Sequence, residues 1–412
     1  MNKKISLGAA IAYMALVAAV VFAITSIRSA NIFNDKLKNL DEREATYDKL
    51  SEIDRYVRDN YYGDIDEDAL LSGAAAGYIS GLGDPYARYL TPKEYEAYQK
   101  TDDGQYVGIG VVTELSEDGY IRLRTVYPDS PAASVGLQEG DIIISVDGEP
   151  ARADNYAALT AAFKGDVGTK LTLVKRQDNN ETTLEITRSQ VNTPTVTSQN
   201  ISGSGYIRFS NITAATAEQL DRAVRQLTQE GVSALIFDLR GVSSSNAEYV
   251  MDMLELFCPK GDIACSKDKD GTLTSLGESD AASYDLPMAV LVDDTTVGTP
   301  ELFALVIQQN SKGKVVGLTT AGQGSIQKDY KLIDGSGLVL TTALYATTDG
   351  ETYNGVGVSP DYRVKLNVAD SERANIYGVQ EVDTQLGKAL EVVTVLAKTE
   401  NAVAGSTAAA AD

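Results

Sequence analysis

The sequence contains no histidine among its 412 residues. This absence excludes the Ser-His and Cys-His catalytic mechanisms, and also zinc or iron sites that depend on imidazole ligands. Any catalytic base must therefore be a lysine, an aspartate, a glutamate, a tyrosine or a terminal amine.

Cysteine is almost as scarce, because the chain has only Cys258 and Cys265. Two cysteines are too few for a zinc cluster or a disulfide scaffold, so we expect no metal site and no cofactor. Two unpaired, partly buried thiols are favoured here over a single bridge.

Basic residues are outnumbered, with 36 Lys and Arg against 58 Asp and Glu and a formal net charge of −22. Nucleic-acid binding needs clustered Lys and Arg that neutralise phosphates, so no nucleic acid is expected as a partner. The hydrophobic fraction of 43% and the length are sufficient for two or three folded domains.

One long uncharged run, residues 5–27, lies near the start of the chain. It is long enough to cross a bilayer as a helix. Arg28, close to the best cleavage position, favours an uncleaved anchor over a signal peptide, and the Lys3-Lys4 pair favours an N-terminus inside the cell. The sequence therefore predicts a single-pass cell-membrane anchor over residues 1–30, with the bulk of the chain outside the cytoplasm.

The pattern of apolar residues and turns changes three times along the rest of the chain. These patterns predict a mixed α/β (α+β) multidomain protein. Residues 31–103 have the spacing of helices, with one helix expected from about Glu67 to Ser80. Residues 104–189 have short strands, glycine turns and one clear helix. Residues 190–385 alternate strands with helices, as an α/β layer does. Residues 386–412 predict a helix and an Ala-rich tail.

The segments "YVGIGVV" and "SPAASVGLQEGDIIISVDGEP" lie within the β-rich module. This module resembles a PDZ domain of the kind found in bacterial proteases. The resemblance implies that a glycine loop offers backbone N–H groups to the carboxylate of a peptide, and that the peptide adds as a strand beside the next segment. The alternative is a β-module that only packs against its neighbour. The residues implied are Val107, Gly108, Ile109 and Gly110 for the loop, and Val111, Val112 and Thr113 for the strand.

Further motifs follow in a fixed order: "GDPYARYLTPKEY", the PDZ-like module, "GYIRFSNITAATAEQL", "FDLRG", "GLTTAGQGSIQ" and "TTALYATTDGETYNGVGVSPDYRV". Taken together, the chain resembles the carboxy-terminal processing serine peptidases, also called tail-specific proteases. That family cleaves unfolded or tagged C-terminal ends outside the cytoplasm. Its mechanism uses a serine nucleophile, a lysine base and a nearby glutamine, without histidine.

The resemblance also implies that the chemistry has been lost. Aligning the family's glutamate with Glu301 puts the nucleophile position at Gly298, and "AGQGSIQ" puts the lysine position at Gln323. The family's glutamine is retained as Gln327. Glycine has no side chain that could attack a carbonyl, and a glutamine amide cannot accept a proton at ordinary pH. In the family's oxyanion loop, the glycine pair is replaced by serines within residues 241–245.

The sequence offers three substitutes for the lost nucleophile, of which Ser243 to Ser245 have no obvious lysine partner. Thr299 is predicted to be the N-cap of a helix, followed by a first-turn proline and acid. Ser325 and Lys328 are three residues apart on an extended segment, so they should point to opposite faces.

The sequence thus favours a membrane-anchored pseudopeptidase that binds peptide or protein C-termini. An active peptidase relative is a further candidate partner. The alternative is an active serine-type endopeptidase with a displaced nucleophile, and a third hypothesis is a purely structural domain with a closed PDZ groove.

Overall fold

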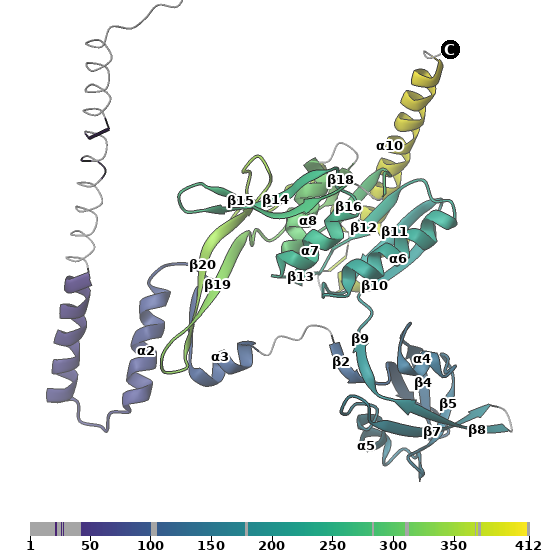
Figure 1. Ribbon diagram of the computed structural model, residues 1–412, viewed down its shortest axis with the longest axis horizontal. Helices are drawn as coiled ribbons and strands as arrows, with labels where there is room; N and C mark the ends of the chain where they lie inside the picture. Colours follow the sequence, from purple (N-terminus) through teal and green to yellow (C-terminus); the bar gives the residue numbers. More distant parts are fainter. Residues whose placement is uncertain are drawn as a thin grey trace, which may run out of the picture. The chain divides into compact units, whose positions relative to one another are not determined.

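The computed structural model describes residues 21–22, 26, 28, 43–99, 105–177, 180–281, 284–309, 313–366, 368–369 and 372–409 (Figure 1). The chain divides into two compact units, Met1–Ala74 and Ala75–Asp412, and the boundary falls inside helix α2 (Glu67–Ser80). In the first unit, residues 43–60 form a charged helix, and α2 has the bounds that the sequence predicts.

The predicted transmembrane helix requires a correction. A bilayer-spanning helix needs about 20 consecutive, mostly apolar residues. None of the helices in the described part of the chain meets this need. The longest of these, α10 (Thr384–Ala409), is interrupted by charged residues such as Lys388 and Lys398. Most of the predicted span, residues 5–27, lies outside the described residues. The predicted single-pass membrane location is therefore not supported.

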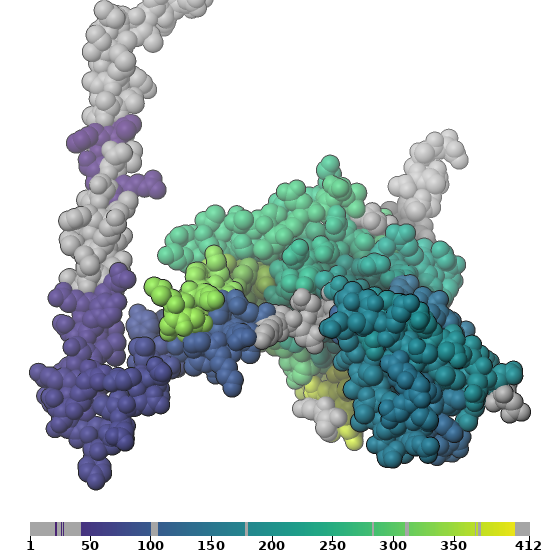
Figure 2. Space-filling model, turned by 60° about the horizontal axis from the view of Figure 1, so that its bottom comes forward, coloured from purple at the N-terminus to yellow at the C-terminus, as the bar shows by residue number. Residues whose placement is uncertain are grey.

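The β-rich module of the second unit has its own core and is the dark teal body in Figure 2. Its main sheet has the strand order β3-β4-β5-β7-β8, with β6 on β5, while β2 pairs with β9. Burial alternates along β4, because Ile121 and Leu123 are buried and Arg122 and Arg124 are exposed, as expected for a sheet with one packed face. The elements are β2 (Gln105–Gly108), β3 (Val111–Leu115), β4 (Ile121–Val126), α4 (Pro131–Ser134), β5 (Ile142–Val146), β6 (Glu149–Pro150), α5 (Tyr156–Ala161), β7 (Lys170–Gln177), β8 (Asn180–Thr187) and β9 (Ser189–Asn192).

The strand–helix alternation builds a layered domain around a six-stranded sheet of order β10-β11-β12-β16-β18-β21. Strands β11 to β21 along this order run parallel, and β10 joins as the antiparallel arm of a hairpin. Helices α6, α7 and α8 cover one face of the sheet and α10 covers the other (Figure 1). Leu235 and Phe237 of β12 point to the first face and Ile236 to the second. This explains why β12 is apolar without alternation.

The elements of this domain complete the order along the chain. They are β10 (Val196–Ile201), β11 (Ser204–Phe209), α6 (Thr216–Gln229), β12 (Leu235–Asp238), β13 (Ser243–Ser244), α7 (Ala247–Glu255), β14 (Gly261–Asp268), β15 (Leu273–Ser279), β16 (Met288–Val292), β17 (Val297–Gly298), α8 (Thr299–Gln309), β18 (Gly313–Gly317), β19 (Ser325–Lys331), β20 (Gly337–Ala346), β21 (Tyr362–Arg363), α9 (Arg373–Ile376) and α10. A second sheet has the strand order β1-β20-β14-β15, and β19 also pairs with β20. Its first strand is β1 (Arg88–Leu90), which helix α3 (Pro92–Gln99) follows in the chain. Cys258 and Cys265 are both buried and free, as the sequence predicts.

A buried ion cluster closes the carboxyl end of β12. The Arg240 guanidinium lies 2.7 Å from a carboxylate oxygen of Asp238 and 2.7 Å from one of Asp383, and all three side chains are fully or almost fully buried. Asp383 also accepts the backbone N–H of Leu386 at 3.0 Å, which caps the first turn of α10. Burial alone would raise the pKa of Asp238, but Arg240, followed by Arg208, outweighs it and holds the pKa below its ordinary value. This contribution to stability is therefore present above pH 3.8 and is lost as the pH falls through the folded pKa.

Removing one member of this cluster should destabilise the domain strongly. We expect Asp383→Ala to lower the free energy of unfolding by about 3–5 kcal/mol, because it leaves a buried guanidinium short of one partner. Glu185→Ala is the matched control, since its pair with Lys170 lies at the surface and should be worth less than about 1 kcal/mol. Urea unfolding at pH 7 measures both losses, and equal losses would contradict the cluster's importance.

Candidate functional site

Position 298 lies at the turn between a buried strand and a helix, as the sequence predicts. All residues of β16 are buried, and a turn leads through β17 into α8. The Asp293 carboxylate holds this turn, because one of its oxygens accepts the backbone N–H of Thr295 at 3.0 Å and that of Gly241 at 3.3 Å. Its other oxygen accepts the Tyr377 hydroxyl at 2.6 Å.

The fully buried carboxylate of Glu301 brings the predicted positions together. One of its oxygens accepts the backbone N–H of Gly298 at 2.8 Å and the backbone N–H of Gln323 at 2.9 Å. The other accepts the backbone N–H of Gly322 at 2.7 Å and the Thr320 hydroxyl. Because a single oxygen accepts both amides, positions 298 and 323 are close neighbours although they are 25 positions apart along the chain.

The start of α8 differs from the prediction for Thr299. The helix begins at Thr299, so Gly298 precedes it at the N-cap position, and the predicted N-cap role of Thr299 is wrong. Glu301 reaches back to the N–H of Gly298, which is one half of a capping box. The buried Thr299 hydroxyl has no hydrogen-bond partner within the described part of the chain.

The backbone at Gly298 leaves no room for a side chain. Its φ is +83°, in the left-handed region that favours glycine. Gly298 pairs with Ser244 in the short parallel ladder of β13 and β17. A Cβ atom at position 298 would lie only 2.0 Å from the carbonyl oxygen of Ser244. A serine side chain is therefore incompatible with this conformation of the β13 loop.

The loop over residues 241–246 is fixed by several contacts. The carbonyl of Val242 accepts the backbone N–H of Val297 at 3.0 Å, and the carbonyl of Ser245 accepts the Tyr345 hydroxyl at 3.0 Å. An oxyanion site needs N–H donors aimed at the developing negative charge. Here a carbonyl oxygen, that of Ser244, faces position 298 instead. That carbonyl oxygen can only accept a hydrogen bond, so it cannot stabilise an oxyanion.

Ser325 and Gln327 lie on one face of β19, and Lys328 lies on the other. The Gln327 amide donates to the Ser325 hydroxyl at 3.4 Å. The Lys328 ammonium lies over the ring of Tyr330, so Lys328 takes the face opposite to that of Ser325 and Gln327, as strand periodicity predicts. Lys328 is therefore not placed to activate Ser325.

Two residues that contact this region, Tyr353 and Thr320, were not predicted from the sequence. The Tyr353 hydroxyl donates to the carbonyl of Gly298 at 2.9 Å and is buried. Burial, with a smaller effect from Glu301, raises the pKa of Tyr353 well above its ordinary value, so the hydroxyl stays protonated. The Thr320 hydroxyl links Glu301 to the backbone N–H of Val358, which it accepts at 2.7 Å. The motifs around both residues were visible in the sequence, but their contact with position 298 was not.

The residues predicted for peptide binding divide between two strands and the turn that joins them. Val107 and Gly108, predicted in a loop, end β2; Ile109 and Gly110 form the turn; the last three begin β3. Strand β3 forms one end of the main sheet, so one of its edges is not paired within that sheet. The backbone N–H of Ile109 donates to the Phe163 carbonyl at 3.2 Å. The Thr113 and Tyr156 hydroxyls lie 2.8 Å apart and connect β3 with α5. A cavity of about 670 Å³ beside β3 is lined by residues that include Tyr106, Val111, Val112, Thr113 and Lys164.

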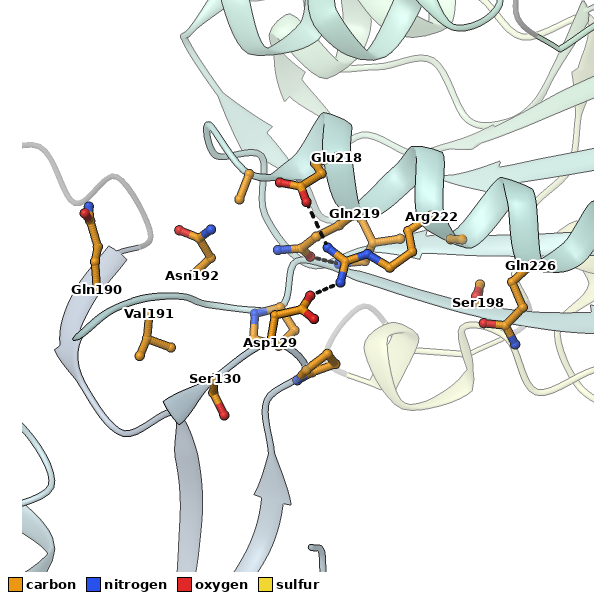
Figure 3. Close-up of a pocket in the computed structure, with 15 residues that line it drawn as sticks. Asp129, Ser130, Gln190, Val191, Asn192, Ser198, Glu218, Gln219, Arg222 and Gln226 are labelled. Atoms are coloured by element: carbon orange, nitrogen blue, oxygen red, sulfur yellow. Dashed lines mark hydrogen bonds and ion pairs between the residues drawn. The ribbon is translucent and has the colours of Figure 1, made fainter. Parts of the chain in front are cut away.

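A smaller pocket of about 300 Å³ lies at the start of α6 and is drawn in Figure 3. Arg222 of α6 forms ion pairs there with Asp129 and with Glu218 (Figure 3). These side chains are about half to three-quarters exposed, so the pairs contribute little. None of the lining residues belongs to the region around Gly298.

Comparisons with known proteins agree with this architecture. Residues 203–364 match peptidase family S41, residues 122–176 match the PDZ domain, and residues 5–94 match the activating protease CtpB N-terminal domain. The chain is 30% identical over 358 residues to the carboxy-terminal processing protease CtpA of Bacillus subtilis (strain 168), covering 86% of this chain and 77% of that protein. It is 25% identical to a CtpA-like serine protease of Staphylococcus aureus (strain MSSA476), covering 84% and 70%. Among solved structures, the photosystem II D1 C-terminal processing protease is 24% identical with a TM-score of 0.48, covering 78% of this chain and 89% of that one.

The steric constraint at position 298 can be measured directly. We expect Gly298→Ala to lower the free energy of unfolding by roughly 2–5 kcal/mol, from left-handed strain plus overpacking against Ser244. Gly231→Ala is the matched control, because Gly231 has a φ of +80° but open space around its Cβ position. The control should cost only about 1–2 kcal/mol. Equal losses in urea unfolding would show that the β13 loop moves aside easily.

Proposed function

Because the chain belongs to the peptidase S41 family of carboxy-terminal processing peptidases, with a PDZ domain, we propose that it binds protein C-termini without cleaving them. The family's relatives named above are processing proteases. In this chain the peptide-binding module is retained, whereas the positions predicted for nucleophile and base hold Gly298 and Gln323.

One observation carries the proposal: the Ser244 carbonyl oxygen lies where a nucleophile's Cβ would have to be. A serine hydroxyl needs room beside the substrate carbonyl and N–H donors for the oxyanion. Gly298 supplies no hydroxyl, and the loop presents an acceptor in place of donors. Gln323 adds to the argument, since its amide cannot act as a base.

The binding part of the proposal rests on the PDZ module. The unpaired edge of β3 can accept a peptide as an added strand, and the adjoining loop carries the amides for a terminal carboxylate. The ligand class is therefore the C-terminal segment of a polypeptide. A catalytically active relative is a second partner class, which this chain would regulate by presenting or shielding C-termini.

A second candidate function is an active endopeptidase with a displaced nucleophile. The observation that favours it is the buried Thr299 hydroxyl, which follows Gly298 and has no hydrogen-bond partner in the described residues. Against it, no lysine takes part in the contacts around Glu301 that the structure describes. The unassigned hydroxyl nonetheless gives this alternative a specific test.

Catalysis is tested with the full chain and casein in a long incubation, followed by mass spectrometry. We expect no cleavage by the natural sequence. We also expect none from Gly298→Ser/Gln323→Lys, because the Ser244 carbonyl excludes the new side chain. Cleavage that persists through repurification and disappears in Thr299→Val would overturn the proposal in favour of the second candidate.

Binding is tested by fluorescence anisotropy with the full chain. The probe is a fluorescein-labelled decapeptide of glycine and serine ending in leucine, alanine and valine. Its C-terminal carboxamide is the control. We expect about tenfold tighter binding of the free carboxylate, since amide bonds to a charged acceptor are the stronger ones. Equal binding of the two peptides would contradict C-terminus recognition.

A further inference from the structure

A short segment, residues 373–378, lies at the carboxyl end of β16; it comprises α9 and the two residues after it, and we call it the strap. The Tyr377 hydroxyl donates to a carboxylate oxygen of Asp293 at 2.6 Å, and the Arg373 guanidinium donates to Asp294 at 2.6 Å. Both aspartates directly follow β16. Parallel α/β sheets commonly bind ligands outside the carboxyl ends of their strands. Here the chain's own strap lies at that edge.

Two arginines fix the ring of Tyr377. The guanidinium carbon of Arg240 lies 4.1 Å from the ring centroid and that of Arg208 lies 4.8 Å from it, and a cation over an aromatic face is an attractive contact. Both arginines are anchored on Asp238, at 2.7 Å and 3.0 Å. Burial, with the bond to Asp293, raises the pKa of Tyr377 above its ordinary value, so the hydroxyl stays protonated. The ring therefore has a fixed orientation, and its hydroxyl remains a donor to Asp293.

Asp293 connects the strap to the two segments that meet at position 298. One of its oxygens accepts the Tyr377 hydroxyl, and the other accepts the backbone N–H groups of Thr295 and Gly241. The bond from Gly241 is the longest of the three, at 3.3 Å, so it is the first that a turn of the carboxylate would break. Gly241 begins the loop whose Ser244 carbonyl faces position 298. A single carboxylate thus joins the strap, the turn before α8 and the β13 loop.

We propose that Tyr377 is a positioning residue that, through Asp293, holds the loop over residues 241–246 in the conformation that places the Ser244 carbonyl against Gly298. This inference rests on the proposed function, in which that carbonyl excludes a nucleophile. With the Tyr377 hydroxyl present, the carboxylate is held on both oxygens. Without it, the carboxylate is free to turn, and the loop loses an anchor. Parts of the strap are exposed, so the closure of position 298 depends on a surface segment.

The test is a double-mutant cycle in the full chain. Tyr377→Phe removes one oxygen and keeps the ring between the two arginines. In the natural background, Gly298→Ala should raise the equilibrium constant of unfolding more than Gly231→Ala does, because only position 298 meets the Ser244 carbonyl. We expect Tyr377→Phe to reduce that excess about tenfold, since a released loop makes room for the Cβ atom and residues of one network couple by about this much. The cost of Gly231→Ala should not change.

The matched control for the lost hydroxyl is Tyr284→Phe. The Tyr284 hydroxyl also donates to a carboxylate at 2.6 Å, that of Asp221. Asp221 belongs to α6 and not to the segments that meet at position 298. Tyr284→Phe should therefore leave the excess cost of Gly298→Ala unchanged, because the costs of separate sites add.

Hydrogen–deuterium exchange supplies a readout that needs no substitution at position 298. In Tyr377→Phe, fragments covering residues 241–246 should exchange about tenfold faster than in the natural chain, because the loop has lost an anchor. Tyr284→Phe should leave the exchange of this loop unchanged. This measurement keeps the inference testable if Gly298→Ala prevents folding.

The outcomes separate this inference from the proposed function. An additive cycle, or unchanged exchange over residues 241–246, would overturn the role of Tyr377, while the casein and peptide experiments would still support binding without cleavage. Cleavage of casein by the natural chain would overturn the proposed function, whereas a non-additive cycle would still support the role of Tyr377 in holding the loop.

Discussion

The buried carboxylate of Glu301 is the interaction on which the site depends. It accepts three backbone amides and one hydroxyl, from segments on both sides of α8, and so it joins the turn before the helix to the segment around Gln323. A charged acceptor in a buried setting must be satisfied in this way, since an unpaired buried carboxylate would be very costly. In our proposal, this bonding keeps the segments around positions 298 and 323 together for structural reasons, without a need for reactive side chains.

The glycine at position 298 and the conformation of the β13 loop depend on each other. With no Cβ at Gly298, the Ser244 carbonyl can approach the backbone, and with that carbonyl in place no larger residue fits. The loop is held down further by Tyr345 and by the short ladder of β13 with β17. In our proposal, the loss of the nucleophile and the closure of the oxyanion loop result from the same change in packing.

The PDZ module differs from the region around position 298. Beside Gly298, the Ser244 carbonyl is backbone fixed by the short ladder of β13 with β17. Strand β3 of the PDZ module keeps one edge that is not paired within its sheet, and it lines a cavity of about 670 Å³. We therefore infer that binding is retained where catalysis is not.

The sequence alone determined the mixed α/β class, the order of motifs and the residue types at positions 298, 323 and 327, because these depend on residue identity and local periodicity. It also led to errors: the uncharged run at the start predicted an anchor that none of the described helices supports, and Thr299 was assigned as an N-cap. Only the tertiary structure decided which atoms face Gly298, which donors Glu301 accepts, and that the Tyr353 hydroxyl contacts the Gly298 carbonyl. Those contacts join segments that the fold brings together, and a local sequence pattern holds no information on which way a carbonyl or a ring will turn.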